Sequence, residues 1–358
     1  MRILFLQQQP CVRALKYAAA LRAAYPRIRL GFAYQGKTLS GWYGSGDELF
    51  ERWWKLGSDP IEGLRAAYTE FRPDLIHSHN LPDSLTAIAL DLFAGRVPVV
   101  HDIHDLQSLR RTPYEHGFAE PLEPLVLEQL AVEESSALVA VSEELLEEVR
   151  ARYRPTALTL AFPNYALGRD LPSELPPSER RNAHPPRLVY QGTLSTNGGH
   201  YDLREIFRAI VSEGLSLDVY PSRAVLAYAE LAAGLTGLHV HATLPPPRLL
   251  AVLPEYDFGW AGFNSALNGA HLDTCLPNKA YEYIGCGLPV LTLRHLALSR
   301  LVGDGGLGLS LATLDDLAGQ LAAVDVVGLR RRVALARLDL TVEANIHRLA
   351  ELYEAVAG

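Results

Sequence analysis

The chain has 358 residues, 48% hydrophobic and 21% charged, which is the composition of a folded globular protein and long enough for two domains. Its formal net charge of -8 argues against a broad nucleic-acid-binding face, because such a face requires clustered Lys and Arg. The three cysteines, Cys11, Cys275 and Cys286, are widely separated and lack Cys-x-x-Cys spacing, so we expect neither disulfides nor structural metal.

The first residues, MRILFLQQQP, include an apolar run too short for a signal peptide, and we interpret them as a first strand. No window approaches the roughly 20 apolar residues of a membrane span. We therefore expect a soluble, cytoplasmic protein.

Short apolar runs alternate with amphipathic helical patterns, which is typical of βα units around a parallel sheet and indicates the α/β class. The strands predicted in the first half of the chain are Arg2–Leu6, Ile28–Tyr34, Leu75–His77, Val97–Ile103 and Ala137–Val141. Ser142 is a plausible N-cap of the helix that follows the last of them. These elements predict an N-terminal Rossmann-like domain over residues 1–168.

The helical and strand periodicity stops between Ala166 and Pro186, where proline and charged residues predominate, so we predict a linker over residues 169–186. A second Rossmann-like domain is expected over residues 187–340. Its predicted strands are Arg187–Gly192, Leu215–Tyr220, Leu238–His241, Asp257–Ala261 and Val290–Thr292. Residues 341–358 have helical spacing and are expected to form a closing helix that packs back on the first domain.

The segment LPNKAYEYIGCGLPVLT, Leu276–Thr292, predicts a helix that begins at Pro277, ends at Cys286-Gly287 and precedes a buried strand. Glu282 lies on the same face as Asn278 and near Lys279. A carboxylate in that place can accept both hydroxyls of a ribose, and Lys279 at a helix N-terminus can face a diphosphate. The alternative is an amphipathic helix with a surface Glu-Lys pair.

The strand Arg187–Gly192 ends in a loop of small and polar residues, whose N–H and hydroxyl groups can bind a diphosphate. The loop is equally consistent with an ordinary glycine-rich turn. Arg223, after the next strand, is a further candidate for charge neutralisation. The loop residues predicted to bind the ligand that carries this diphosphate are Gly192, Thr193, Ser195, Asn197 and Gly198.

Four histidines, His77, His79, His101 and His104, follow two neighbouring strands to their carboxyl ends, where ligands bind in open parallel sheets. Positions 101, 103 and 105 face one way and positions 102 and 104 the other, so no single face of that strand collects ligands. We therefore predict no metal site. A histidine at a strand end is also often a polar residue with an ordinary structural partner.

Arg13 and Lys16 lie one helical turn apart after the first strand. They are candidates for anion contacts with a substrate, together with His79. A solvated basic patch is the alternative. The choice of that substrate is expected to depend on this region and on Leu106–Phe118.

Several segments together resemble GT-B glycosyltransferases, specifically glycosyltransferase family 4. The Pro-x-Lys-x-x-Glu-Tyr pattern of Leu276–Thr292 resembles the donor-binding motif of that family. RPDLIHSHN, VPVVHDIHDL, ALVAVSEEL and FPN resemble four of its other elements in order and spacing. The resemblance implies two Rossmann-like domains facing a central cleft, and it places His104 near the donor sugar. On this reading Arg13, Lys16 and His79 are candidates on the side of the acceptor.

The chain departs from the family pattern in three places. Thr274 occupies the position of a Glu that contacts the donor sugar, although Asp273 is adjacent and could substitute. The phosphate loop has no basic residue before Arg204, which leaves Lys279 to neutralise the diphosphate. The first strand is followed by QQQPCVRALK in place of a glycine-rich turn.

The predicted function is transfer of a sugar from a UDP- or GDP-linked donor to an acceptor hydroxyl, with retention implied by the resemblance. His104, Asp273 and Lys279 are the predicted catalytic residues, and no cofactor is expected. The acceptor is a glycan, a lipid-linked molecule or a small molecule, and weak membrane-surface association is possible if it is lipid-linked. The alternatives are a sugar-nucleotide epimerase of the same fold and a catalytically silent binding subunit.

Overall fold

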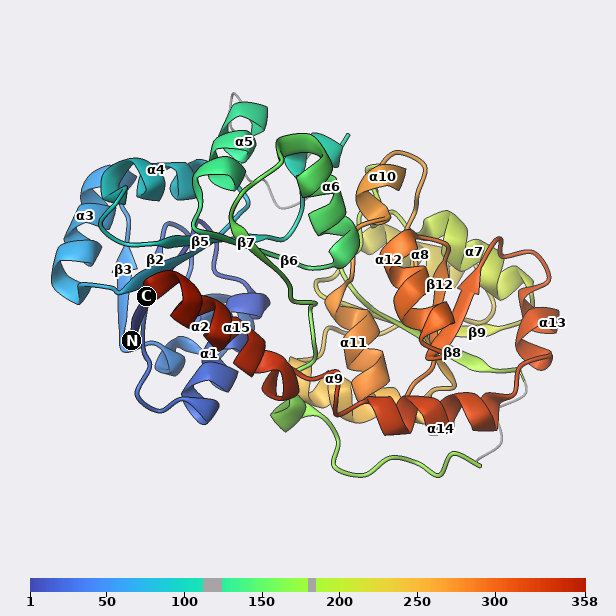
Figure 1. Ribbon diagram of the computed structural model, residues 1–358. Coiled ribbons are helices and arrows are strands. Elements are labelled where there is room, and N and C mark those ends of the chain that lie inside the picture. The colour runs from blue at the N-terminus through green and yellow to red at the C-terminus, as the bar shows by residue number, and fades with distance from the viewer. Residues whose placement is uncertain (112–123, 180–184) are drawn as a thin grey trace. The chain divides into compact units, whose positions relative to one another are not determined.

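The computed structural model describes residues 1–111, 124–179 and 185–358, and the chain divides into two compact units (Figure 1). The first unit comprises Met1–Asn164 and Val342–Gly358, and the second comprises Tyr165–Thr341. Each unit is built on one parallel sheet with helices between its strands. The predicted α/β class with two Rossmann-like domains is confirmed.

The first sheet has the strand order β3-β2-β1-β4-β5-β6-β7, with every pair parallel. All five strands predicted in this half are present, whereas the short edge strands β3 and β7 were missed. Their bounds are β1 Arg2–Gln7, β2 Arg29–Tyr34, β3 Arg52–Lys55, β4 Leu75–His79, β5 Val99–Ile103, β6 Ala137–Ala140 and β7 Leu158–Ala161.

Helices cover both faces of the first sheet. Leu4 and Leu6 of β1 pack with residues of α3 and α4, while Phe5 points to the opposite face, where its ring lies 5.1 Å from that of His77. Ser142 caps α6 as predicted, because its hydroxyl accepts the Leu145 N–H at 3.0 Å. The helices are α1 Val12–Ala24, α2 Leu39–Tyr43, α3 Pro60–Phe71, α4 Ser84–Phe93, α5 Pro124–Glu134 and α6 Glu143–Tyr153, with short 3-10 turns η1 Asp47–Leu49 and η2 Gln107–Leu109.

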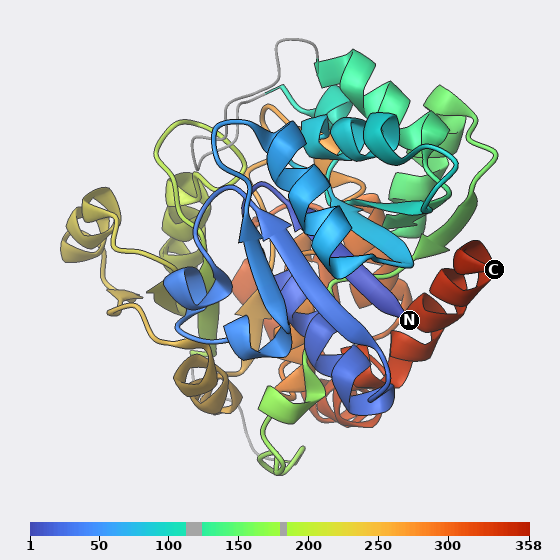
Figure 2. The same cartoon turned by 90° about the vertical axis from the view of Figure 1, so that its left-hand side faces the viewer.

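The last helix, α15 Val342–Ala357, belongs to the first unit although it follows the second in sequence. It packs against α1 and is the red helix in Figure 2. The hydroxyl of Tyr353 lies 2.5 Å from Nδ1 of His77, so α15 reaches the buried polar residues of β4. The closing helix therefore completes one face of the first sheet.

The second sheet has the order β10-β9-β8-β11-β12-β13 and is also entirely parallel. The five predicted strands are present, and the edge strand β13 was missed. Their bounds are β8 Arg187–Gly192, β9 Ser216–Pro221, β10 Leu238–Val240, β11 Phe258–Trp260, β12 Val290–Leu293 and β13 Gly308–Leu311.

An apolar core that includes Tyr190, Phe207, Tyr228 and Trp260 fills the second unit. The helices are α7 Arg204–Ser212, α8 Leu226–Ala233, α9 Pro246–Val252, α10 Gly269–Leu272, α11 Asn278–Gly285, α12 Leu296–Ser299, α13 Leu317–Ala322 and α14 Val326–Ala336. Shorter elements are the 3-10 turns η3 Gly168–Asp170 and η4 Leu253–Glu255 and the π-helical turn η5 Arg300–Asp304.

The segment predicted as a linker packs against the second unit. The side chain of Leu171 lies over Gly285, and the Arg337 guanidinium donates to the carbonyls of Pro172 and Gly285, both at 2.9 Å. The chain therefore passes from one unit to the other at Asn164, and residues 165–179 belong to the second unit. Residues 180–184 of the predicted linker and residues 112–118 of the predicted acceptor region lie outside the described residues.

Candidate functional site

The candidate residues of each unit lie at the point where the strand order of its sheet reverses. In the first sheet this point is between β1 and β4, and in the second it is between β8 and β11. Helical connections leave such a point in opposite directions, which opens a crevice at the carboxyl ends of the strands. His79 ends β4 and Gly192 ends β8, so both candidate groups are in the expected place for ligand binding.

Helix α11 carries Lys279 and Glu282. The helix begins at Asn278, and Pro277 precedes it in an extended conformation at the N-cap, one residue earlier than expected. Gly287, with φ of +79°, follows the C-cap Cys286 as predicted. The helix packs closely on β11, because a Cβ on Gly259 would lie 2.4 Å from the ring of Tyr283.

Lys279 is the most unusual group of the second unit. Its Nζ donates a hydrogen bond of 2.9 Å to the Tyr190 hydroxyl and lies 4.1 Å from the centre of that ring. Burial lowers the pKa of Lys279 to about 7, against the opposing attraction of Glu282. The amine therefore changes its charge near neutral pH, unlike an ordinary lysine.

Gly192 allows Lys279 to reach the end of β8. Its φ is +125°, and a Cβ there would lie 3.4 Å from Nζ of Lys279. Glu282 is half-buried, and its carboxylate accepts a 2.7 Å hydrogen bond from the Gln191 side chain. The structure thus brings together the predicted residues Gly192, Lys279 and Glu282, and half-buried Asn278 begins the same helix.

Sequence analysis missed Tyr190 and Gln191 as parts of this site. Both lie on the strand RLVYQG, and Tyr190 is two residues before Gly192, hence on the same side of the sheet. The Tyr190 hydroxyl donates to the Thr193 carbonyl at 2.5 Å and accepts from Lys279. The alternation of β8 was the signal that could have identified Tyr190.

The glycine-rich loop differs from the prediction. The Gly198 N–H donates to the Asp202 carboxylate at 3.0 Å, and the side-chain oxygen of Asn197 accepts the Gly199 N–H at 2.9 Å and the Ser195 hydroxyl at 3.0 Å. Arg204 also pairs with Asp202. The Gly198 N–H therefore already has a carboxylate partner, and phosphate binding by this loop stays a prediction.

The two residues proposed for the sugar also have structural partners. The buried Thr274 donates its hydroxyl to the His271 carbonyl at 2.8 Å, within its own turn. Asp273 accepts the Leu296 N–H at 3.3 Å and lies 3.4 Å from Nδ1 of His295, so it holds the start of α12. Arg223 is exposed after β9.

Arg13 is buried and forms hydrogen bonds within the first unit. It is 3% exposed, and its Nε lies 3.0 and 3.1 Å from the two carboxylate oxygens of Asp102. Its remaining nitrogens donate to Asn164 and to the Phe162 carbonyl. Lys16 is 5% exposed, so the alternative of a solvated basic patch is wrong, and contact of Arg13 and Lys16 with an acceptor stays a prediction.

Asp102 is the centre of a buried polar group in the first unit. Burial alone would raise its pKa, but the Arg13 guanidinium and the hydrogen bond from His77 hold that pKa well below its usual range. Nε2 of His77 lies 3.2 Å from Asp102, and its Nδ1 lies beside Tyr353. His77 is therefore fully occupied as a structural residue.

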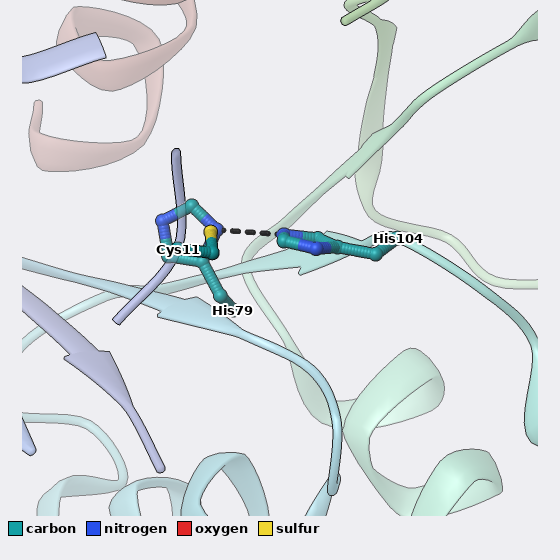
Figure 3. Close-up of side chains that lie close together, drawn as sticks. All are labelled: Cys11, His79 and His104. Carbon is teal, nitrogen blue, oxygen red and sulfur yellow. Dashed lines mark hydrogen bonds between the residues drawn. The ribbon is translucent and has the colours of Figure 1, made fainter. Parts of the chain in front are cut away.

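His79 and His104 form the neighbouring pair, with 2.9 Å between Nδ1 of His79 and Nε2 of His104 (Figure 3). Burial lowers the pKa of His104 to about 4, and burial with the nearby His77 holds the pKa of His79 well below 6.5. Both rings are neutral at pH 7. His104 is 17% exposed, so part of its ring is accessible.

Three of the four histidines lie on one face of the sheet. His101 points to the opposite side of β5, toward Thr86 and Asp83, as the alternation predicts. His77 and His79 come from the neighbouring strand β4, which the expectation for β5 alone did not include, and they lie near Asp102 on the same face as His104. Cys11, the N-cap of α1, joins His79 and His104 there and was missed because it is remote in sequence.

Comparison with known proteins agrees with this architecture. Residues 11–165 match the model of a family described as glycosyl transferase 4-like domain. Sucrose-phosphate synthase from Thermosynechococcus elongatus has a TM-score of 0.73 at 13% identity, with 99% of each chain covered. Residues 11–165 thus resemble a glycosyl transferase 4-like domain, and the whole chain has the GT-B fold. The predicted family resemblance is confirmed.

Other solved structures share the fold of this chain. Anabaena HepE in complex with UDP-glucose has a TM-score of 0.69 at 16% identity, covering 99% of this chain and all of that one. A UDP-GlcNAc 2-epimerase from Neisseria meningitidis, bound to UDP-GlcNAc, has a TM-score of 0.61 at 11% identity, covering 98% and 99%. A search of curated protein sequences finds no match. None of the helices in the described ranges has the length and apolar character needed to cross a membrane.

Proposed function

We propose that the protein transfers a sugar from a UDP- or GDP-linked donor to an acceptor hydroxyl, with retention at the anomeric carbon. The observation that carries the proposal is the buried Lys279 at the carboxyl end of β8, one helical turn from Glu282. A cation and a carboxylate one helical turn apart suit the diphosphate and the ribose of one nucleotide. The UDP and UDP-glucose complexes of HepE, which shares the fold, support a nucleotide-sugar donor.

Lys279 supplies the positive charge for the leaving group. The bond between the anomeric carbon and the diphosphate oxygen breaks, and the oxygen keeps the electron pair. The acceptor oxygen bonds to the anomeric carbon, and its proton passes to the leaving diphosphate or to solvent. Lys279 as an ammonium stabilises the charge that develops on the diphosphate, inside a site where water does not screen it. The transfer needs no cofactor in this scheme.

Glu282 accepts the ribose hydroxyls. Its carboxylate now accepts from Gln191, and two ribose hydroxyls can occupy further lone pairs of the same group. Asn278 at the start of α11 provides an additional polar side chain. These assignments place nucleoside recognition on β8 and α11.

The glycine-rich loop must change before it can bind phosphate. Asp202 now occupies the Gly198 N–H and pairs with Arg204, at 2.7 Å between Nη2 and Oδ2. A donor diphosphate could displace the carboxylate and take both partners, which would supply the basic residue that the loop lacks. Arg223 is exposed and available for the same charge.

The assignments of His104, Asp273 and Thr274 to the donor sugar and of His79 to the acceptor stay predictions. The contacts of Asp273 and Thr274 favour a structural role for both. We propose a glycan, a lipid-linked molecule or a small molecule as acceptor, a cytoplasmic location, and a place in glycan or glycoconjugate biosynthesis. Weak association with a membrane surface would accompany a lipid-linked acceptor.

The first experiment is a thermal-shift screen of the purified protein against UDP, GDP, ADP, TDP and their sugar conjugates. A ligand that binds only the folded protein raises the melting temperature. Glu282→Ala is expected to lose most of the shift, whereas Glu230→Ala, an exposed residue on α8, should keep it. An undiminished shift in Glu282→Ala would disprove the ribose assignment.

The screen is followed by product analysis to separate the alternatives. Transfer to an acceptor in a broad panel supports the proposal. Conversion of the sugar nucleotide without any acceptor would indicate an epimerase. The UDP-GlcNAc 2-epimerase from Neisseria meningitidis has the same fold. Tight donor binding without turnover would indicate a silent subunit, which the occupied glycine-rich loop favours as the second candidate.

A further inference from the structure

Three side chains that are far apart in sequence lie together at the carboxyl end of the first sheet. Cys11 is the N-cap of α1, His79 ends β4, and His104 directly follows β5. Each offers one ligand atom, and these atoms all lie within 4.8 Å of one another (Figure 3). We call these three residues the Cys–His cluster.

One nitrogen of the cluster has no partner. His79 is 1% exposed, and its Nε2 is buried without a hydrogen bond, while its Nδ1 faces Nε2 of His104. A buried polar atom left without a partner costs about 1–3 kcal/mol, and such an atom in a folded protein calls for an explanation. A small rotation of the rings would let one nitrogen of His79 and Nε2 of His104 bind the same ion.

The surroundings of Cys11 suit a metal ligand. A zinc ion binds imidazole through a lone pair of the neutral ring and cysteine as the thiolate. The N–H groups of Ala14 and Arg13 and the side chain of Gln7 are hydrogen-bond partners of the Cys11 sulfur, and they would stabilise its thiolate when an ion is bound.

We propose that the Cys–His cluster binds one divalent ion of the zinc class through Cys11, His79 and His104, with a fourth position open to solvent or a ligand. A thiolate with two imidazoles is a donor set for Zn²⁺ rather than for Mg²⁺ or Ca²⁺. A tetrahedral zinc ion requires about 3.3 Å between two nitrogens and about 3.6 Å from nitrogen to sulfur. The spacing of the cluster needs an adjustment of roughly an ångström at most to meet these values.

Asp102 lies beside the two nitrogens that face each other. Its oxygens lie 3.7 Å from Nδ1 of His79 and 3.9 Å from Nε2 of His104, and Arg13 and His77 fix its position. Its negative charge would favour a cation next to these nitrogens. His77 is not a ligand, because both of its nitrogens are already engaged by Tyr353 and Asp102.

The test uses the full-length protein after treatment with a chelator and exhaustive dialysis. Titration with Co²⁺ is expected to bind one ion per chain and to produce the thiolate-to-cobalt charge-transfer band with the visible bands of a tetrahedral site. Zn²⁺ should abolish both sets of bands by displacement and raise the melting temperature. The readout is independent of the proposed glycosyl transfer.

Variants assign the ligands. Cys11→Ser is expected to lose the charge-transfer band and to weaken Co²⁺ binding at least tenfold, and His104→Asn to weaken it similarly. Cys275→Ser and Cys286→Ala, which change cysteines outside the cluster, should each keep the band. These two controls assign the thiolate by elimination even if Cys11→Ser does not fold. Absence of the band in the native chain, or its persistence in folded Cys11→Ser, would overturn the proposal.

Discussion

Lys279 carries its amine into a site lined by aromatic rings. Besides the Tyr190 ring, the rings of Tyr201 and Phe263 each have their centres 5.6 Å from Nζ. Burial disfavours the charged form, whereas the ring faces and the Tyr190 hydroxyl stabilise it only in part. The folded protein therefore holds a charge that a bound anion would stabilise.

A first prediction follows for Lys279→Met. Replacing a buried charged group by an apolar one of similar length is expected to leave stability unchanged or raise it by about 1–3 kcal/mol near pH 6. Donor binding should be lost at the same time. Urea denaturation and thermal shift with the donor measure the two effects, and Lys55→Met on the surface is the control. Strong destabilisation with donor binding retained would contradict a binding role for the amine.

A second prediction concerns pH. The ammonium form of Lys279 predominates below pH 7 in the free protein, and a bound diphosphate raises its pKa. Between pH 7 and that raised pKa, binding requires uptake of one proton, so the affinity for a nucleotide sugar should fall by up to about tenfold per pH unit. Calorimetric titration from pH 6 to pH 9 measures it. Arginine stays charged over this range, so in Lys279→Arg the affinity should depend less on pH. If the affinity of that variant falls with pH as steeply as before, Lys279 is not the group that takes up the proton.

At the scale of the elements, the position of α11 decides whether Lys279 and Glu282 reach β8. The helix can approach only because Gly259 of β11 has no side chain beneath the ring of Tyr283. The Tyr283 hydroxyl also accepts the Gln191 N–H at 2.9 Å, which ties the helix to β8. The site residues are thus held by strand-to-helix packing as well as by their own contacts.

A third prediction tests this packing. Gly259→Ala is expected to destabilise the protein by about 1–3 kcal/mol, because its Cβ cannot fit beside Tyr283 without moving α11. Donor affinity should also fall, measured on protein that is still folded. Gly269→Ala is the matched control, since a Cβ there meets nothing within 4 Å. Equal stability of the two variants would show that α11 does not depend on the close approach.

The predicted elements were accurate wherever the pattern was strong. The buried strands have uninterrupted apolar runs, and Ser142, Pro277 and Gly287 mark helix ends through local chemistry. The edge strands β3, β7 and β13 were missed because charged, hydroxyl or glycine residues leave each of them without an apolar run, whereas the edge strand β10 was predicted. Local sequence therefore identifies central elements better than edges.

At the scale of the whole molecule, the order of segments along the chain does not match their division between the two units. Helix α15 lies at the end of the sequence but packs in the first unit, and residues 165–179 pack in the second. Tyr353, on α15, contacts His77 of β4, which belongs to the buried polar group around Asp102. The first unit is therefore incomplete without the last residues of the chain.

A fourth prediction addresses this dependence. Deletion of Val342–Gly358 is expected to reduce hydrogen-exchange protection in β1 and β4 strongly while β8 and β9 stay protected, because the helix belongs to the first unit. Deletion of residues 354–358, which are mostly exposed and follow Tyr353, is the control and should have little effect. Equal loss of protection in both sheets would indicate that the units do not unfold separately.

The sequence by itself determined the α/β class, the central strands, the helix that carries Lys279 and Glu282, and the resemblance to glycosyltransferase family 4. Each of these depends on periodicity, capping or spacing within a short stretch of chain. The tertiary structure alone decided which side chains are free. Arg13 reaches Asp102, and Cys11 lies within 4.8 Å of the ligand atoms of His79 and His104, because packing joins residues whose separation along the chain leaves no local signal. Asp202 is only four residues from Gly198, but the conformation of the loop decides that its carboxylate accepts the Gly198 N–H.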